Sequence, residues 1–232
     1  MTMQIQAIKV QRLYLQVAQQ LQQLIAGGEF EVGARLPAER DLASQFGVSR
    51  PTIREAMIAL EIAGLVEVRS GSGVYVSRQK ANLGKLGDDQ EPGPFEILEA
   101  RRMIESEACA LAAERISVAQ LEELDALLTQ MERTDQTAED AEEVDHQFHC
   151  IIAEACGNSA IAATILWLWQ LRNESEISTH FHSRVRQEGS RPIVEDHQMI
   201  LQALRDRDGG KAREAMAGHL QRVIDTLMSE GQ

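Results

Sequence analysis

The stretch that decides the fold is Leu36 to Val76, LPAERDLASQFGVSRPTIREAMIALEIAGLVEVRSGSGVYV. Its pattern predicts a first short helix over 38–46, which ends at Gly47 because glycine readily adopts the left-handed turn after a helix. Ser49 is a suitable N-cap for a second helix. Two short strands around the Ser-Gly-Ser-Gly sequence follow. This order of elements predicts a winged helix-turn-helix.

The second helix of this stretch has the features of a recognition helix. Its apolar side contains Ile53, Met57 and Leu60, whereas Arg50, Thr52 and Arg54 occupy its first turn. The N-terminal residues of a recognition helix contact base edges in the major groove. Arginine can bind guanine through two hydrogen bonds, and hydroxyl groups can bind phosphates. The sequence therefore predicts binding to double-stranded DNA.

The charge of the chain is divided unevenly. The whole chain has 232 residues and a net charge of −13. Residues 1–80 contain 9 Lys and Arg against 7 Asp and Glu, and residues 81–232 contain 14 against 29. The acidic second part should be repelled by DNA, so we expect it to have another role.

Three further patterns bear on location. The cysteines are odd in number and lack C-x-x-C spacing, which is typical of reduced thiols in the cytoplasm. We find no signal peptide pattern. The most apolar stretch, 160–169, is too short to span a membrane. We therefore expect a cytoplasmic protein with no membrane partner.

The periodicity predicts a mainly α protein with three segments: a winged helix-turn-helix over 1–77, a linker over 78–94, and an all-α bundle of six or seven helices over 95–232. The linker is polar and contains several Gly and Pro residues. Gly209 and Gly210 are expected to form the break between the last two helices. The surroundings of His180 and His182 are polar, which favours a solvated loop.

Four residues of the second part form a candidate metal site. Asp145 and His149 lie four residues apart and therefore on one face of a helix. His197 and His219 each lie on the apolar stripe of a different predicted helix. Three imidazoles and a carboxylate suit Zn²⁺, and also Ni²⁺ or Mn²⁺. A lone histidine on an apolar face is more often a hydrogen-bonded core residue, and the sequence does not show that these helices converge.

Residues 10–77 resemble the DNA-binding domain of the GntR family of bacterial transcription regulators. The resemblance covers the amphipathic first helix, the LP-x-E and GVSR-x-T-x-REA segments, and the glycine-rich wing. It implies that a set of residues contacts DNA, with the last at the tip of the wing: Arg40, Ser49, Arg50, Thr52, Arg54 and Gly71. It also implies a homodimer that binds a palindromic operator.

Residues 95–228 resemble the effector (FCD) domain of the FadR-type branch of that family. The resemblance is carried by D-x-x-F-H over 145–149, the Glu195–Ala203 stretch and the Ala215–Leu220 stretch. It implies a metal bound by Asp145, His149, His197 and His219. The segment 93–113 is similar to hexuronate-operon repressors, which implies a sugar-acid effector of the uronate type and assigns Arg101 to its carboxylate.

The function expected from these features is that of a DNA-binding regulator that a small organic acid controls through the metal site. The resemblance implies a repressor, the usual role in this family. Two alternatives stay open. The metal could be purely structural, with an effector that avoids it. The chain could also be a metal-dependent hydrolase fused to a DNA-binding module, because Glu195 or Asp196 could serve as a base.

Overall fold

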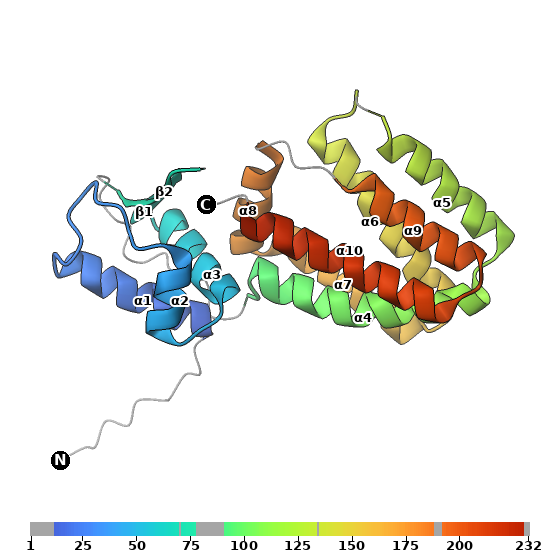
Figure 1. Cartoon of the computed structure of the whole chain (residues 1–232), viewed down its shortest axis with the longest axis horizontal. Coiled ribbons are helices and arrows are strands. Elements are labelled where there is room, and N and C mark those ends of the chain that lie inside the picture. The colour runs from blue at the N-terminus through green and yellow to red at the C-terminus, as the bar shows by residue number, and fades with distance from the viewer. Residues whose placement is uncertain (1–11, 70, 78–90, 134, 188–191, 230–232) are drawn as a thin grey trace, which may run out of the picture. The chain divides into compact units, whose positions relative to one another are not determined.

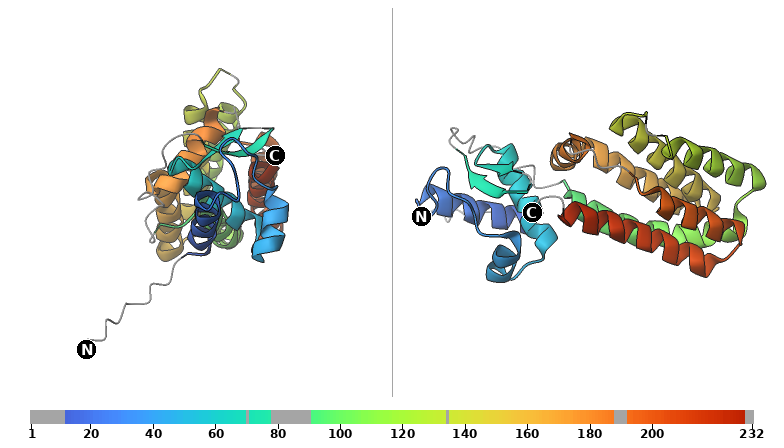
Figure 2. Two further views of the ribbon diagram at one scale, coloured as in Figure 1. Left: turned by 90° about the vertical axis from the view of Figure 1, so that its left-hand side faces the viewer. Right: turned by 45° about the horizontal axis from the view of Figure 1, so that its top comes forward.

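The computed structural model describes residues 12–69, 71–77, 91–133, 135–187 and 192–229. The chain divides into two compact units, with the boundary between Glu91 and Pro92 (Figures 1 and 2). Most of the expected linker, 78–90, lies outside the described residues.

The N-terminal unit is a winged helix-turn-helix, which confirms the predicted fold. Three helices precede a two-stranded antiparallel hairpin. Their bounds are α1 (Leu13–Ala26), α2 (Glu39–Phe46), α3 (Arg50–Ile62), β1 (Val66–Arg69) and β2 (Gly73–Val76). The buried side chains of α1 and α3, among them Leu21, Ile53 and Leu60, form its core.

The turn between α2 and α3 has the predicted chemistry. Gly47 has a φ of +67°, in the left-handed region that favours glycine. The Ser49 hydroxyl accepts a hydrogen bond from the backbone N–H of Thr52 at 3.3 Å, so it caps α3. These two residues fix the angle at which α3 leaves the turn.

The wing is a short hairpin in which Val66 pairs with Val76 and Arg69 pairs with Gly73. Gly71 lies in its turn with a φ of +69°. A bridge between Arg35 and Tyr75 attaches the hairpin to the segment before α2. The wing is therefore held beside the helix-turn-helix rather than standing free.

The C-terminal unit is all-helical, as expected. Its described residues form seven helices: α4 (Pro94–Arg115), α5 (Val118–Met131), α6 (Ala138–Ala155), α7 (Ser159–Glu174), α8 (Glu176–Gln187), α9 (Val194–Arg205) and α10 (Gly209–Ser229). Side chains of Ser117, Thr137 and Asn158 cap α5, α6 and α7. The segment around His180 and His182 is helix α8, so the expectation of a loop there is wrong.

Two long helices form the spine of this unit. Helices α4 and α10 run antiparallel and lie side by side (Figures 1 and 2). Phe148 from α6 and Trp169 from α7 are among the most buried side chains of the core that forms against them. The helices that carry the four candidate ligands, α6, α9 and α10, all contribute to this core.

The structure corrects the predicted position of the break at Gly209 and Gly210. Both glycines belong to the first turn of α10, and the break lies just before them, where Arg207 has a φ of +57°. The Asp208 carboxylate accepts from the N–H of Lys211 at 3.0 Å, which stabilises the new helix start. A Cβ at Gly209 would lie 3.1 Å from the Ala110 carbonyl oxygen. Glycine therefore allows α10 to approach α4 closely.

The three cysteines are free thiols, as the sequence suggested. Among the helices that the structure describes, none is long and apolar enough to cross a membrane. The apolar stretch 160–169 falls within α7, where Trp169 is buried and Trp167 is exposed.

Candidate metal centre and DNA-binding face

The structure brings the four candidate ligands together. Asp145 and His149 lie one turn apart on α6, His197 lies on α9, and His219 lies on α10. Each offers one ligand atom, and these atoms all lie within 4.8 Å of one another. The three histidines are buried, and Asp145 is partly buried. This convergence is the property that periodicity alone left open.

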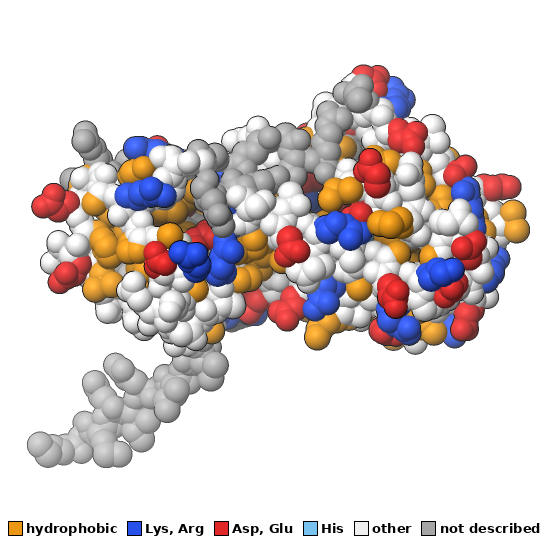
Figure 3. Space-filling model, viewed as in Figure 1, with side chains coloured by type: hydrophobic (Ala, Val, Ile, Leu, Met, Phe, Trp, Pro, Cys, Tyr) orange, Lys and Arg blue, Asp and Glu red, His pale blue; other side chains and the backbone are white. Residues whose placement is uncertain are grey.

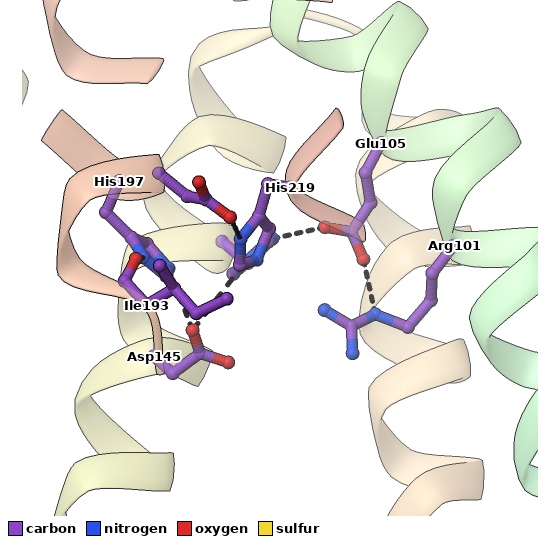
Figure 4. A network of polar contacts seen from close by, with 8 residues as sticks. Arg101, Glu105, Asp145, Ile193, His197 and His219 are labelled. Atoms are coloured by element: carbon purple, nitrogen blue, oxygen red, sulfur yellow. Dashed lines mark hydrogen bonds and ion pairs between the residues drawn. The ribbon is translucent and has the colours of Figure 1, made fainter. Parts of the chain in front are cut away.

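Each of the three histidines is held through its Nδ1 atom. His149 Nδ1 contacts Glu105 of α4, His197 Nδ1 contacts the Ile193 carbonyl at 2.9 Å, and His219 Nδ1 lies 3.4 Å from Asp196. Figure 4 shows two of these partners, Glu105 and Ile193, on opposite sides of the cluster. An acceptor on one ring nitrogen fixes the tautomer and orients the other nitrogen, as in metal-ligating histidines.

The remaining Nε2 atoms fit a metal ion. His197 Nε2 lies 2.8 Å from Asp145 Oδ1, and His149 Nε2 lies 3.9 Å from the same oxygen. His149 Nε2 is also buried without a hydrogen-bond partner in the described part of the chain. A buried nitrogen with no partner is costly in a native structure, and a metal ion would satisfy it. The donor set can therefore hold a divalent cation.

The electrostatics favour the protonation states that metal ligands need. Burial lowers the pKa of His219 to about 4, although Asp196 opposes the shift. Burial raises the pKa of Asp145, but the hydrogen bond with His197 and the nearby imidazoles outweigh it and leave that pKa well below its usual range. At neutral pH His219 is therefore neutral and Asp145 is ionised, as ligation requires.

His197 differs from His219 in this respect. Burial lowers its pKa, but the hydrogen bond and charge of Asp145 outweigh burial and raise it above the ordinary value. Without a metal, Asp145 therefore favours a proton on His197. A metal ion must displace that proton, so binding is coupled to proton release.

Arg101 is buried beside this site. Its Nε donates to Glu105 Oε1 at 2.7 Å, and its guanidinium lies 3.7 Å above the Trp169 ring. Burial raises the pKa of Glu105, but Arg101 and His149 together lower it to about 2. Glu105 thus connects the arginine with the candidate ligand His149, and Figure 4 shows its contact with Arg101.

A cavity of about 100 Å³ opens between the metal ligands and this arginine. Its polar lining consists of Arg101, Glu142, Asp145, Arg172, His182, His219 and Thr226. Apolar side chains, among them Leu98 and Val223, complete the walls. One water needs roughly 10–15 Å³ by this kind of measure, so the cavity has room for a small ligand in place of several waters.

Several residues of this site were not found from the sequence. Glu105 and Asp196 orient histidines, and Glu142, Arg172 and His182 line the cavity. The best available signal was in α8, where Ile177 and Phe181 lie four residues apart and both are buried. His182 lies about 100° from Phe181 but one turn after Ser178, which is also buried, so the inward side of α8 includes both. The charged residues gave no such signal, because a buried ion pair and a surface one look alike in sequence.

The predicted DNA contacts lie around the start of α3 and on the wing. The Arg40 side chain is 86% exposed, and Ser49 and Gly71 are also exposed. Arg50 and Thr52 are partly exposed in the first turn of α3. A hollow of about 480 Å³ lies among α2, Arg50 and β2, and its charged lining is three arginines, Arg35, Arg40 and Arg50, against one carboxylate, Glu39. This is a positively charged surface of the kind that binds phosphates.

Arg54 differs from the other predicted contacts. Its side chain is only 7% exposed, and its Nε donates to Glu39 Oε1 at 3.0 Å. In this conformation Arg54 joins α3 to the start of α2. Its role as a DNA contact stays a prediction.

Acidic and basic side chains are intermixed on the face of the C-terminal unit drawn in Figure 3. The distinctive charges of that unit are instead inside it, around the histidine cluster. A winged helix joined to a helical domain with a buried polar cavity defines a two-part, DNA-binding regulator.

The comparisons with known proteins agree with this class. Residues 13–76 match the family described as bacterial regulatory proteins, gntR family, and residues 96–222 match the FCD domain. The chain belongs to the GntR family of transcription regulators and carries an FCD domain. This is a family of regulators and not of enzymes, which decides against the hydrolase alternative.

Two relatives show where the chain lies within the family. It is 37% identical to the Uxu operon regulator of Haemophilus influenzae over 216 residues, which are 92% of this chain and 81% of that protein. It is also 37% identical to the Exu regulon transcriptional regulator of Escherichia coli over 223 residues, which are 94% of this chain and 86% of that protein.

A solved structure supports the fold. A GntR family regulator from Pseudomonas syringae is 20% identical, covers 93% of this chain and 84% of its own, and gives a TM-score of 0.51.

Proposed function

We propose that this chain binds a palindromic operator as a homodimer and represses transcription until a sugar acid binds beside a metal ion in the C-terminal unit. Arg40, Ser49, Arg50, Thr52, Arg54 and Gly71 are the proposed DNA contacts. Asp145, His149, His197 and His219 are the proposed metal ligands, and Arg101 is the proposed partner of the effector carboxylate.

One observation carries the effector part of this proposal. Four ligand atoms lie within 4.8 Å of one another, and two of their residues, Asp145 and His219, line a cavity that Arg101 also lines. Three imidazoles and a carboxylate suit Zn²⁺ best among common ions, and Ni²⁺ or Mn²⁺ are the alternatives. When bound, the ion would supply positive charge and free coordination positions for an acidic ligand.

The class of effector rests on chemistry and on relatives. A planar guanidinium binds a carboxylate through two parallel hydrogen bonds. Figure 4 shows the Arg101 side chain extending from α4 beside the Glu105 carboxylate. The Uxu operon and Exu regulon regulators are 37% identical to this chain over more than nine-tenths of its length. We infer a related signal, a sugar acid of the uronate type.

The effector acts on DNA binding only through its difference in affinity for two arrangements of the protein. The connection begins at Glu105, which contacts both Arg101 of the cavity wall and the metal ligand His149. A ligand carboxylate that binds Arg101 competes with Glu105 for that arginine. Glu105 in turn joins α4 to α6 through its contact with His149. Effector binding is thereby coupled to the packing of the bundle.

A thermal-shift panel tests this function. Uronates, aldonates and simple carboxylates are added to the full chain, once loaded with zinc and once stripped with a chelator. A ligand at 100 times its Kd stabilises the folded state by about 2.7 kcal/mol. We expect a sugar acid to raise the melting temperature only in the zinc-loaded protein.

Two variants complete the test. His197→Ala should abolish both zinc binding and the acid response. His180→Ala, on α8 and outside the cavity lining, should keep both. If the acid response survives chelation, the metal is structural and the effector avoids it.

A further inference from the structure

A carboxylate of unexplained purpose lies in the cavity wall. Glu142 is on α6, one turn before Asp145, and lines the same cavity as Asp145 and His219. Its Oε1 accepts from Arg172 of α7, and its Oε2 accepts from Arg186 Nη1 of α8 at 2.9 Å. The Glu142 side chain is 22% exposed. Two arginines from two helices therefore hold this carboxylate at the cavity.

Glu142 retains capacity to accept further hydrogen bonds. An ionised carboxylate has about four lone-pair sites. From the described residues Glu142 accepts two hydrogen bonds, both from arginines. Each of its two carboxylate oxygens accepts one of them. A ligand in the cavity can therefore donate hydroxyl groups to Glu142 without displacing either arginine.

His182 offers a second polar contact on the same wall. It is buried on α8 and lines the cavity, and its ring makes no hydrogen bond with the residues that the structure describes. Burial lowers its pKa well below the ordinary value, and Arg172, Arg101 and Arg186 add to that effect. A neutral imidazole has one donor and one acceptor, which matches a hydroxyl group.

The same arrangement disfavours a second carboxylate on the ligand. Arg172 already donates to Glu142, so an added carboxylate must either displace Glu142 or lie beside it. Two like charges at contact distance in a partly buried site repel each other strongly. A hydroxyl group has no such cost.

From this wall we propose that Glu142 is a specificity-determining residue that selects a hydroxylated monocarboxylic acid over both unhydroxylated acids and dicarboxylic acids. The proposal rests on the proposed function, in which one carboxylate binds at the metal and Arg101. Glu142 and His182 then bind hydroxyl groups at the other end of the molecule. Leu98 and Val223 contact its carbon skeleton.

Calorimetric titration of the zinc-loaded full chain tests this selection with four probes: D-glucuronate, D-gluconate, D-glucarate and hexanoate. D-Gluconate and D-glucarate differ only in the second carboxylate, and hexanoate lacks the hydroxyl groups. For the wild type we expect one of the hydroxylated monoacids to bind at least tenfold more tightly than D-glucarate and hexanoate. Tenfold corresponds to about 1.4 kcal/mol.

Glu142→Gln should change the ranking. It removes the negative charge, so the hydroxylated monoacid should lose at least tenfold in affinity and D-glucarate should gain. The matched control is Glu143→Gln, because Glu143 is the next residue on α6 but is exposed and does not line the cavity. This control should leave all four affinities unchanged.

A second variant guards against misfolding of the first. His182→Ala should weaken the hydroxylated monoacids and leave hexanoate unchanged, and zinc content and melting temperature report the integrity of each variant. Equal affinity ratios in wild type and Glu142→Gln would overturn the inference while leaving the sensor function intact. If no carboxylate binds the zinc-loaded wild type, the proposed function itself fails and this inference fails with it.

Discussion

The two units of the chain place their functional charges in opposite ways. In the N-terminal unit, Arg40 and Arg50 line a hollow at the surface, and the core beneath them is mainly apolar, with Arg54 and Glu55 as its buried charged residues. In the C-terminal unit, Arg101, Glu105 and Asp196 are buried among the core helices. The first unit can bind a partner without changing its core, whereas in the second the binding groups are part of the core.

This difference has a functional consequence. A ligand that contacts surface arginines alters little in the packing below them. A ligand that contacts Arg101 acts on an ion pair that joins α4 to α6 through His149. In the proposed function, the buried position of the site is therefore what would allow a small molecule to change the arrangement of helices.

The largest effect is expected for Glu105→Ala. This change leaves the buried Arg101 guanidinium without its carboxylate, and breaking a buried pair by removing one partner costs about 3–5 kcal/mol. Both tryptophans, Trp167 and Trp169, lie in α7, so tryptophan fluorescence during denaturant unfolding reports on the C-terminal unit. The measurement uses chelator-stripped protein, so that lost metal binding does not contribute.

The control for this variant is two residues away on the same helix. Glu107 pairs with Arg213 on the surface, and both side chains are well exposed. Glu107→Ala should cost less than about 1 kcal/mol, because exposed ion pairs contribute little. Equal losses in the two variants would show that burial of the Glu105 network does not distinguish the C-terminal unit.

Arg50→Ala tests the surface of the other unit. We expect it to reduce discrimination between operator and random DNA by about 1–3 kcal/mol, because a base-contacting arginine supplies that amount. The operator is first selected from a random DNA pool with wild-type protein, and binding is measured at one fixed salt concentration. The stability of the C-terminal unit should not change.

Arg205→Ala is the matched control for Arg50. Arg205 is exposed on α9 of the acidic unit and pairs with Asp125. Its loss removes the same charge from the chain but should leave DNA discrimination unaltered. If Arg50→Ala binds operator and random DNA as the wild type does, the assignment of α3 as the recognition helix is wrong.

The sequence predicted the fold of the N-terminal unit in more detail than the site of the C-terminal unit. The reason is the distance along the chain between the residues that interact. Gly47, Ser49 and the wing act within a few residues, so local patterns were enough for the fold of the N-terminal unit. The four candidate metal ligands lie on three helices, and inward-facing stripes predicted their direction but not their convergence. The partner of His149 is Glu105, 44 residues earlier. No local pattern distinguishes such a residue from a surface glutamate.

The two wrong predictions in the C-terminal unit have the same origin. Gly209 was expected to end a helix, but it begins α10, because its missing side chain serves close packing against Ala110 of α4. His182 was expected in a solvated loop, but α8 turns it toward the cavity. In both cases a tertiary contact gave the residue a role that its neighbours in sequence did not indicate.

The smallest effect is expected for Ser49→Ala, and it separates two roles of one residue. As the N-cap of α3, Ser49 should contribute about 1 kcal/mol to the stability of that helix. Hydrogen exchange of the first turn of α3 measures this loss. Ser44→Ala is the control, since Ser44 is exposed and its side chain makes no hydrogen bond with the described residues.

The DNA-binding result then completes the comparison of the two units. If Ser49 acts only as a cap, exchange in α3 rises and operator affinity falls by no more than the lost helix stability. A larger fall in affinity means that the hydroxyl also contacts phosphate. Either way the change should stay within the N-terminal unit, because Ser49 is exposed at the start of α3 and hydrogen-bonds within that helix. A change in metal affinity after Ser49→Ala would contradict that separation.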